Sequence, residues 1–249
     1  MPHISIKAEP IFSVFNFPVT NSFLTSLIVT FLFFFIAFFY YSEIKKTHKS
    51  TFFYLLHYAL RTLYNFFQTI IGNKINIFFT LLGGIFFYII LQNWIGLLPG
   101  VGSILIKSAV HESELVPLFR GNNSDLNTTI GLAILAVFLI QYYSIKYLGL
   151  QGYVKRFFNI RNPVDIFVGV LEVISEFSKV VSFSFRLFGN VFAGEVLITI
   201  LAFLIPTVLS FALFPFLVLE IFVGFIQALV FSMLTAVFIN MAISSHHEE

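Results

Sequence analysis

Long, uninterrupted apolar stretches dominate this chain, and its polar residues gather between them. A strand of a membrane barrel would alternate over about ten residues, whereas an apolar run of about 20 residues fits a membrane-crossing helix. We therefore expect helices that span a bilayer. The predicted crossing segments are residues 22–41, 75–97, 128–148, 165–204 and 207–244.

Residues 51–72 show a different pattern, in which aromatic residues and polar residues such as His57, Arg61 and Asn65 fall on alternate faces of a helix. A helix with one apolar and one polar face is typical of the membrane interface. We expect residues 51–72 to form an amphipathic interfacial helix.

The last two apolar stretches are about twice the length of about 20 residues that a vertical crossing needs. Each either breaks into two short spans or forms one long, strongly tilted helix. No polar turn interrupts them, and Pro215 is the only proline inside either stretch. The sequence favours two long tilted helices that form a hairpin with its turn near Pro206.

Composition supports this class. The chain of 249 residues is 58% hydrophobic and only 10% charged, whereas soluble domains have about a quarter charged residues. We predict an all-α integral membrane protein with one polytopic domain over residues 1–249. It consists of an outer segment (1–21), three spans with the interfacial helix (22–148) and the tilted hairpin (149–249). The absence of cysteine excludes disulfides and thiolate chemistry.

Basic residues predict the orientation, because Lys and Arg are enriched on the cytoplasmic side of a membrane. Nine of the 14 lie in residues 43–74 and 146–165, and three lie in segments that five crossings place on the other side. We expect the N-terminus outside and the C-terminus in the cytoplasm.

Arg186 lies within the apolar residues 180–195. Its guanidinium cannot lose its proton, since its pKa exceeds about 12, and placing it at mid-membrane costs about 2.5–3.5 kcal/mol or more. A charge that costs this much indicates a task. Six ionisable residues lie well inside the apolar stretches of the hairpin: Glu172, Glu176, Lys179, Arg186, Glu195 and Glu220.

Helical phase separates these groups. Ser182, Gly189 and Ala193 share the face of Arg186, and small residues let a second helix approach closely in lipid. Glu195 lies about 180° away at 100° per residue. The pattern predicts a closely approached face that carries a fixed cation, and a second face that carries a carboxylate.

Other polar residues extend this pattern. Glu220 and Gln227 are seven positions apart and share one helix face, and Asn190 lies near the face of Arg186. Glu172 and Glu195 are separated by about 34 Å of helix axis, so they suit entrances on opposite sides of a bilayer. Buried carboxylates suit proton relay, whereas arginine can only attract, orient or expel a proton. The sequence thus predicts a proton route interrupted by a permanent positive charge.

Structural interpretations stand beside the functional ones. Lys179 suits a snorkelling side chain or a partner of Glu176 or Glu172, Glu176 suits just that partner, and Glu172 also suits a favourable charge at a helix N-terminus. Asn190 and Gln227 also suit hydrogen bonding between helices. Asp125 either gates an outer vestibule or caps the next helix.

Four stretches together closely resemble subunit a of F-type ATP synthases. The most specific is Ser184–Glu195, with the core Arg-Leu-Phe-Gly-Asn. The others are Asn93–Gly100, Ser124–Thr129 and Phe225–Leu234, in the same order along the chain. The resemblance covers residues 75–245.

The resemblance implies a stator subunit with two offset proton half-channels facing a rotating ring of c subunits. The family's essential arginine falls on Arg186. The positions of the family's proton path fall on Glu195, Glu220, Gln227, Asn190 and Glu172. The implied partners are the c-subunit ring, b-type peripheral stalk subunits, the rest of the ATP synthase and the lipid bilayer. No nucleic acid, cofactor or metal is expected, and no phosphate-binding G-x-x-x-x-G-K-[ST] motif occurs.

Glutamate at both 195 and 220 departs from the His/Glu pairing that mitochondrial relatives often have. This favours a bacterial plasma membrane, with the chloroplast thylakoid membrane as the alternative. The sequence leaves H⁺ and Na⁺ open, because the surroundings of the ring carboxylate set the ion. The alternative function is an ion channel or secondary transporter in which Arg186 binds an anionic substrate. Transporters of that class usually show repeats and broken helices, and this sequence shows neither.

Overall fold

The structure is a computed structural model that describes residues 8–14, 17–98, 101, 104–107, 115–157, 163–204 and 211–244. Its α-helices are α1 (Asn21–Ile44), α2 (Thr51–Ile71), α3 (Ile75–Ile95), α4 (Leu126–Phe157), α5 (Pro163–Leu204) and α6 (Phe214–Ser244). Short 3₁₀ turns include η1 (Gly72–Lys74) and η2 (Asn122–Ser124). The strands are β1 (Pro10–Val14), β2 (Phe17–Thr20), β3 (Leu105–Lys107) and β4 (Leu115–Pro117).

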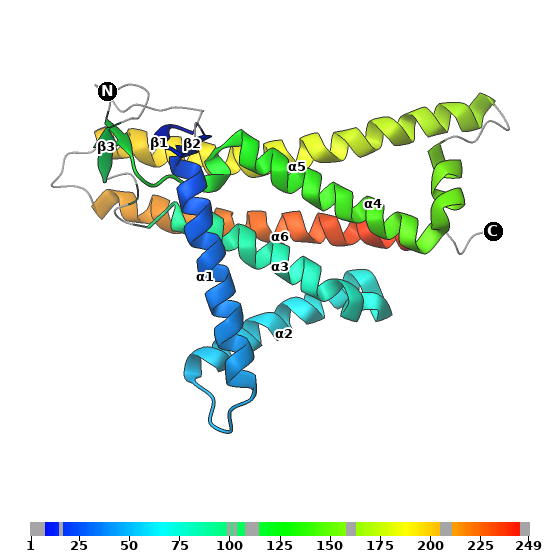
Figure 1. The fold of residues 1–249 in the computed structure, drawn as a ribbon, viewed down its shortest axis with the longest axis horizontal. Helices are drawn as coiled ribbons and strands as arrows, with labels where there is room; N and C mark the ends of the chain where they lie inside the picture. Colours follow the sequence, from blue (N-terminus) through cyan, green and yellow to red (C-terminus); the bar gives the residue numbers. More distant parts are fainter. Residues whose placement is uncertain are drawn as a thin grey trace.

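Three long helices form the body of the molecule. Figure 1 shows α4, α5 and α6 side by side along the longest axis, with α1 running across that direction. The helix α3 packs against α6, and α4 packs against both α5 and α6. Among the described residues, five apolar helical runs are long enough to cross a membrane, and the predicted all-α membrane fold is confirmed. The hairpin of α5 and α6 lies at a large angle to α1, consistent with strong tilt (Figure 1).

The helix α2 has the expected amphipathic character. Phe53, Leu63, Phe67 and Ile71 are buried against the rest of the protein, while polar residues such as Arg61 are exposed. The corner before α2 is closed by Glu43, which is buried. Its carboxylate pairs with Lys46 and accepts a hydrogen bond of 2.9 Å from the backbone N–H of Ser50. The contacts of Glu43 with Lys46 and Ser50 therefore hold this corner, and the hydropathy pattern did not indicate them.

Two helix ends differ from the sequence prediction. The third span was expected to end at residue 148, but α4 continues to Phe157 through a kink at Gly149, whose φ is +74°. Glycine adopts this left-handed backbone without a steric cost. Pro215, expected inside a helix, is the second residue of α6, where its missing N–H has no helical partner to lose. Pro206 lies outside the described residues.

The polar connector between the second and third spans is only partly a loop. It contains the antiparallel pair β3–β4, and the segment before α4 is buried from Arg120 to Asp125. A second antiparallel pair, β1–β2, precedes α1. Side-chain amides satisfy part of the buried segment: Asn123 Nδ2 donates to Asn93 Oδ1 at 2.7 Å, and Asn93 Nδ2 donates to the Gly224 carbonyl at 3.0 Å.

The buried segment approaches the end of α3 at backbone distance. A Cβ on Gly96 would lie 2.9 Å from the Cα of Gly121, a separation that backbone atoms can relieve only by moving. Glycine at 96 therefore permits the connector to reach the interior between the helices.

We predict that Gly96→Ala loosens the connector and lowers the stability of the folded protein by about 1–3 kcal/mol, because overpacking displaces backbone. The matched control is Gly84→Ala, since an added Cβ at Gly84 meets nothing within 4 Å. The midpoint of thermal unfolding of the purified protein checks this prediction. Equal midpoints for the two variants would contradict the close approach.

Candidate ion-translocation site

Arg186 lies on the same face of α5 as the exposed Ser182 and Gly189, and is itself half-buried. Its Nη2 donates a hydrogen bond of 2.9 Å to Ser182 Oγ, one turn earlier. Within the described part of the chain, no carboxylate forms an ion pair with Arg186. A permanent cation in an apolar helix thus has no acidic partner from the described residues.

The small residues predicted near this cation form an open strip. Ser182, Gly189 and Ala193 are exposed, and a Cβ added at Gly189 would meet nothing within 4 Å. The neighbours of the strip are large exposed apolar residues such as Phe185 and Leu197. This face of α5 is therefore apolar, smooth at its centre and not covered by the described residues.

A cavity of about 330 Å³ opens on the other side of α5. It collects four of the predicted proton-path residues from two helices: Asn190 and Glu195 of α5, and Glu220 and Gln227 of α6. Asn190 Nδ2 donates to Gln227 Oε1 at 2.6 Å, and the Gln227 side chain is buried with its Nε2 unpartnered among the described residues. Buried unpartnered polar atoms of this kind are ordinarily satisfied by water.

The carboxylate of Glu220 lies directly on the backbone of α5. A Cβ at Gly194 would stand 1.8 Å from Glu220 Oε1 and 2.0 Å from its Cδ. Glycine next to Glu195 therefore makes room for the second acid, and the two carboxylates share one cavity.

One charged residue of this cavity was missed at the level of sequence. Arg120, from the connector, is 6% exposed, and its Nε lies 3.3 Å from Glu195 Oε1. From its position in the sequence, Arg120 is one of the three basic residues expected on the non-cytoplasmic side of the membrane. The partners are 75 positions apart, so no local pattern indicates the pair.

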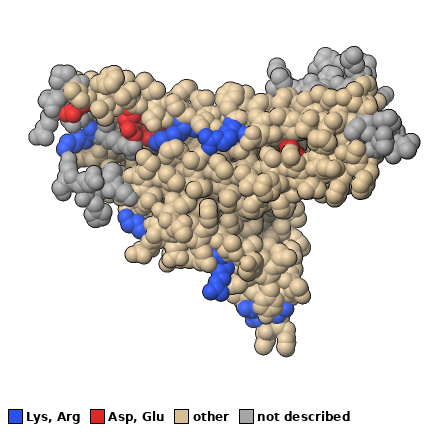
Figure 2. Space-filling model, turned by 180° about the vertical axis from the view of Figure 1, so that it is seen from behind, with Lys and Arg blue, Asp and Glu red and all other residues tan. Residues whose placement is uncertain are grey.

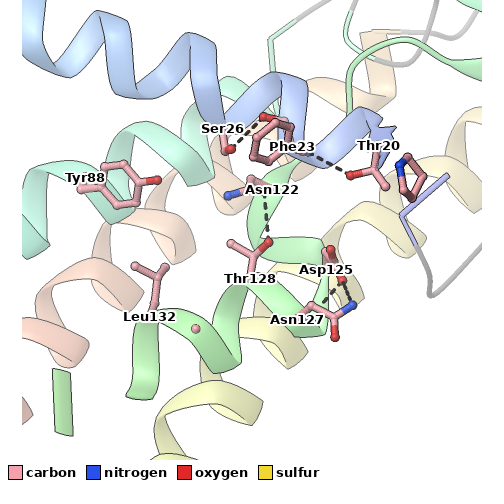
Figure 3. A pocket seen from close by; sticks show the side chains of 11 residues that line it. Thr20, Phe23, Ser26, Tyr88, Asn122, Asp125, Asn127, Thr128 and Leu132 are labelled. Carbon is pink, nitrogen blue, oxygen red and sulfur yellow. Dashed lines mark hydrogen bonds between the residues drawn. The ribbon is translucent and has the colours of Figure 1, made fainter. Parts of the chain in front are cut away.

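Asp125 lies elsewhere, on a separate cavity of about 450 Å³ between α1, α3 and the start of α4. Figure 3 shows its carboxylate turned to Asn127; Oδ1 accepts from the backbone N–H at 3.1 Å and from the side chain at 3.3 Å. These are the bonds of a helix N-cap. The structure thus shows the capping contact of Asp125 and places it outside the cavity of Glu195.

The remaining acids of α5 lie toward its N-terminal end. Glu176 Oε1 pairs with Lys179 Nζ at 2.6 Å, and its other oxygen accepts from Gln141 of α4. Tyr153 donates to Gln141 at 3.1 Å, so this cluster ties α4 to α5. Glu172 is half-buried one turn before Glu176 and does not line the cavity of Glu195. Figure 2 shows charged side chains in a row along an otherwise uncharged face of the long bundle.

The fold and the site together define a polytopic helical membrane protein. One face of a long helix carries a cation without an acidic partner among the described residues, and another face borders a cavity that contains carboxylates. The sequence matches the family described as ATP synthase A chain over residues 23–240. The chain belongs to this family, and it is a subunit of a membrane-embedded complex for ion transport and ATP synthesis.

Relatives from several sources support this assignment. Over 65% of this chain, it is 37% identical to ATP synthase subunit a of Moorella thermoacetica, across 73% of that protein. It is 37% identical to the chloroplastic subunit a of Oedogonium cardiacum over 67% of this chain and 60% of the relative. It is 31% identical, over 92% of this chain and 76% of the relative, to the Propionigenium modestum subunit named sodium ion specific.

We predict that Gly194→Ala displaces the Glu220 carboxylate and slows ion transport by about ten- to a hundredfold, because small displacements of reacting groups are costly. The fold should survive, since only the end of a flexible side chain must move. Proton pumping by membrane vesicles measures the effect. The shorter acid in Gly194→Ala/Glu220→Asp should restore part of the rate relative to Gly194→Ala; no recovery would separate Gly194 from Glu220.

Proposed function

We propose that this chain is the proton-translocating stator subunit of an F-type ATP synthase and that Arg186 drives deprotonation of carboxylates on a rotating c-subunit ring. The observation that carries the proposal is the half-buried guanidinium of Arg186, which has no acidic partner among the described residues and lies beside a strip of small residues. Such a cation is costly in lipid. An acidic partner on another subunit that slides along the strip removes that cost.

The electrostatics give the direction of each step. A ring carboxylate that faces lipid must be protonated, because burying the anion there is costly. Next to Arg186 the same carboxylate is favoured as an anion, so it releases its proton. Since the guanidinium cannot take up that proton, the proton leaves through water and polar groups, and the arginine separates the two routes.

Two half-channels follow from the positions of the acids along α5. The cavity that Asn190, Glu195, Glu220 and Gln227 line supplies the inlet from the outer side. Glu172 lies toward the N-terminal end of α5 and supplies the exit on the other side. Asp125 lines a separate cavity on the side where the connector lies and joins the path only as part of an outer vestibule.

The assembly follows from the same assignment. The strip of α5 faces the c-subunit ring, and b-type peripheral stalk subunits hold this chain against rotation. The membrane is a bacterial plasma membrane, with the thylakoid membrane as the alternative. The corner between α1 and α2, which carries the exposed Lys45 and Lys46, lies on the cytoplasmic side. On the face that Figure 2 shows, the charged side chains visible on the part of the molecule that projects from the long bundle are basic.

We expect Arg186→Ala to abolish proton-driven ATP synthesis, with a loss of at least about 100-fold, because it removes the charge that stabilises the ring carboxylate as an anion. ATP synthesis by vesicles under an imposed pH gradient is the measurement. The matched control is Arg61→Ala, which removes an exposed arginine from α2. Retained synthesis in Arg186→Ala, with the subunit assembled, refutes the proposal.

The alternative function, an ion channel or transporter, predicts a different result for the purified chain. An ion channel or transporter with Arg186 as an anion site conducts without any rotor. Under our proposal, the purified chain in liposomes gives little proton flux, and it co-purifies with a c-subunit ring when both are present. Rapid flux from the chain alone favours the rival.

The orientation makes a separate prediction, for which the absence of native cysteine gives a clean background. We expect a membrane-impermeant maleimide to label Leu105→Cys in intact cells, because Leu105 is 52% exposed and lies in the outer connector. Thr47→Cys, in the exposed turn between α1 and α2, should react only after the membrane is opened. The reverse pattern of labelling would contradict the orientation.

A further inference from the structure

The guanidinium of Arg120 enters the cavity of Glu195 and Glu220 from the connector. It is 6% exposed, and its Nε lies 3.3 Å from Glu195 Oε1 and 3.1 Å from Ser124 Oγ. A buried arginine is retained only when it is paired. Its place in the cavity therefore indicates a role toward the carboxylates rather than a contact with outer lipid headgroups.

The connector holds Arg120 in place through contacts that do not involve Glu195. The backbone N–H of Arg120 donates to Thr25 Oγ1 of α1 at 3.3 Å. Three residues later, Asn123 is bonded to Asn93 of α3 at 2.7 Å. The neighbouring Gly121 is in close backbone approach to Gly96. These contacts fix the base of the arginine side chain, so its charge is pre-positioned at the cavity.

Among the described residues, the cavity is lined by more acidic than basic side chains. Among the described residues that line it, the charged ones are Arg120 from the connector, Glu195 from α5 and Glu220 from α6. The lining residues of α3, such as Asn93, are uncharged, and Arg186 lies on the opposite face of α5. One permanent cation balances one carboxylate. A second anion in the same small volume is disfavoured by like-charge repulsion.

Geometry decides which acid is the anion. The Glu195 side chain is 40% exposed and lies beside Arg120. Glu220 is only 8% exposed, and its carboxylate rests on Gly194 and accepts no hydrogen bond from the described residues. A carboxylate next to a cation is favoured as an anion, and one without donors is favoured as the neutral acid.

We infer that Arg120 is a positioning residue of the inlet, which holds Glu195 ionised so that Glu220 is the group that takes up and passes on the proton. This inference rests on the proposed function. In each transfer, a proton from the outer water protonates the Glu220 carboxylate, and Glu220 then gives that proton to the ring carboxylate. Glu195 keeps its charge throughout, so Arg120 and Glu195 act as one neutral unit.

The test uses the complete ATP synthase in membrane vesicles and measures proton-driven ATP synthesis against the pH of the inlet side. Arg120→Gln should slow synthesis by about tenfold, because it removes the cation that lies beside the Glu195 carboxylate, and it should move the pH profile to higher pH. Arg120→Lys should retain more of the rate, because it keeps the charge. Arg61→Gln serves as the control for loss of an arginine.

Double variants give the decisive comparison. Glu195→Gln leaves Arg120 facing Glu220 alone, so this variant should also be slow. Arg120→Gln/Glu195→Gln removes the pair together and should be faster than either single variant, whereas Arg120→Gln/Glu220→Gln should show no recovery. The inference would be overturned if the rate losses of Arg120→Gln and Glu195→Gln simply multiplied in the double variant. It would also be overturned if Arg120→Gln synthesised ATP at the rate of the unchanged protein.

Assembly and the proposed function are separated in the same experiment. If Arg120→Gln fails to assemble, the pair hypothesis requires Arg120→Gln/Glu195→Gln to assemble, and failure of both variants overturns it. Arg186→Ala is measured alongside. If Arg186→Ala retains ATP synthesis, the proposed function is wrong. If Arg186→Ala loses ATP synthesis but the effects of Arg120→Gln and Glu195→Gln multiply in the double variant, only the inference about Arg120 is wrong.

Discussion

The constraint on which the structure depends is the cost of a permanent positive charge in an apolar environment. The chain meets this cost in two different ways. Arg120 is buried and lies beside Glu195 of its own chain. Arg186 remains half-buried on an outer face with a serine hydroxyl as its polar contact. Arg186 has no acidic partner among the described residues, and under the proposed function it is available to an acid of another subunit.

Arg186 and the Arg120–Glu195 pair lie at opposite faces of the long helix α5. The outer face is smooth where Ser182, Gly189 and Ala193 lie, which suits a surface that moves past it. The inner face turns Glu195 toward α6 and the connector, where side-chain amides and a cavity replace lipid. Under the proposed function, a single continuous helix carries both the contact with a partner and the wall of a polar route, and its length allows polar groups near both sides of the membrane.

Close backbone contacts support this arrangement as much as charges do. Gly96 lets the connector reach the interior, and Gly194 lets the Glu220 carboxylate lie against α5. The connector is held by hydrogen bonds to α1 and α3, and Asn93 carries the link on to α6. Polar contacts of this kind position helices in lipid, where the hydrophobic effect gives little preference between helix faces.

The sequence by itself determined the class of protein, the helices and the residues of the long hairpin. Lipid demands runs of about 20 apolar residues, and any intramembrane charge such as Arg186 stands out against them. Only the tertiary structure decided which of these residues meet. The burial of residues 120–125, the approach of Glu220 to Gly194 and the pairing of Arg120 with Glu195 join positions far apart in the chain. Periodicity reports the face of one helix, and it carries no information about which distant segment will cover that face.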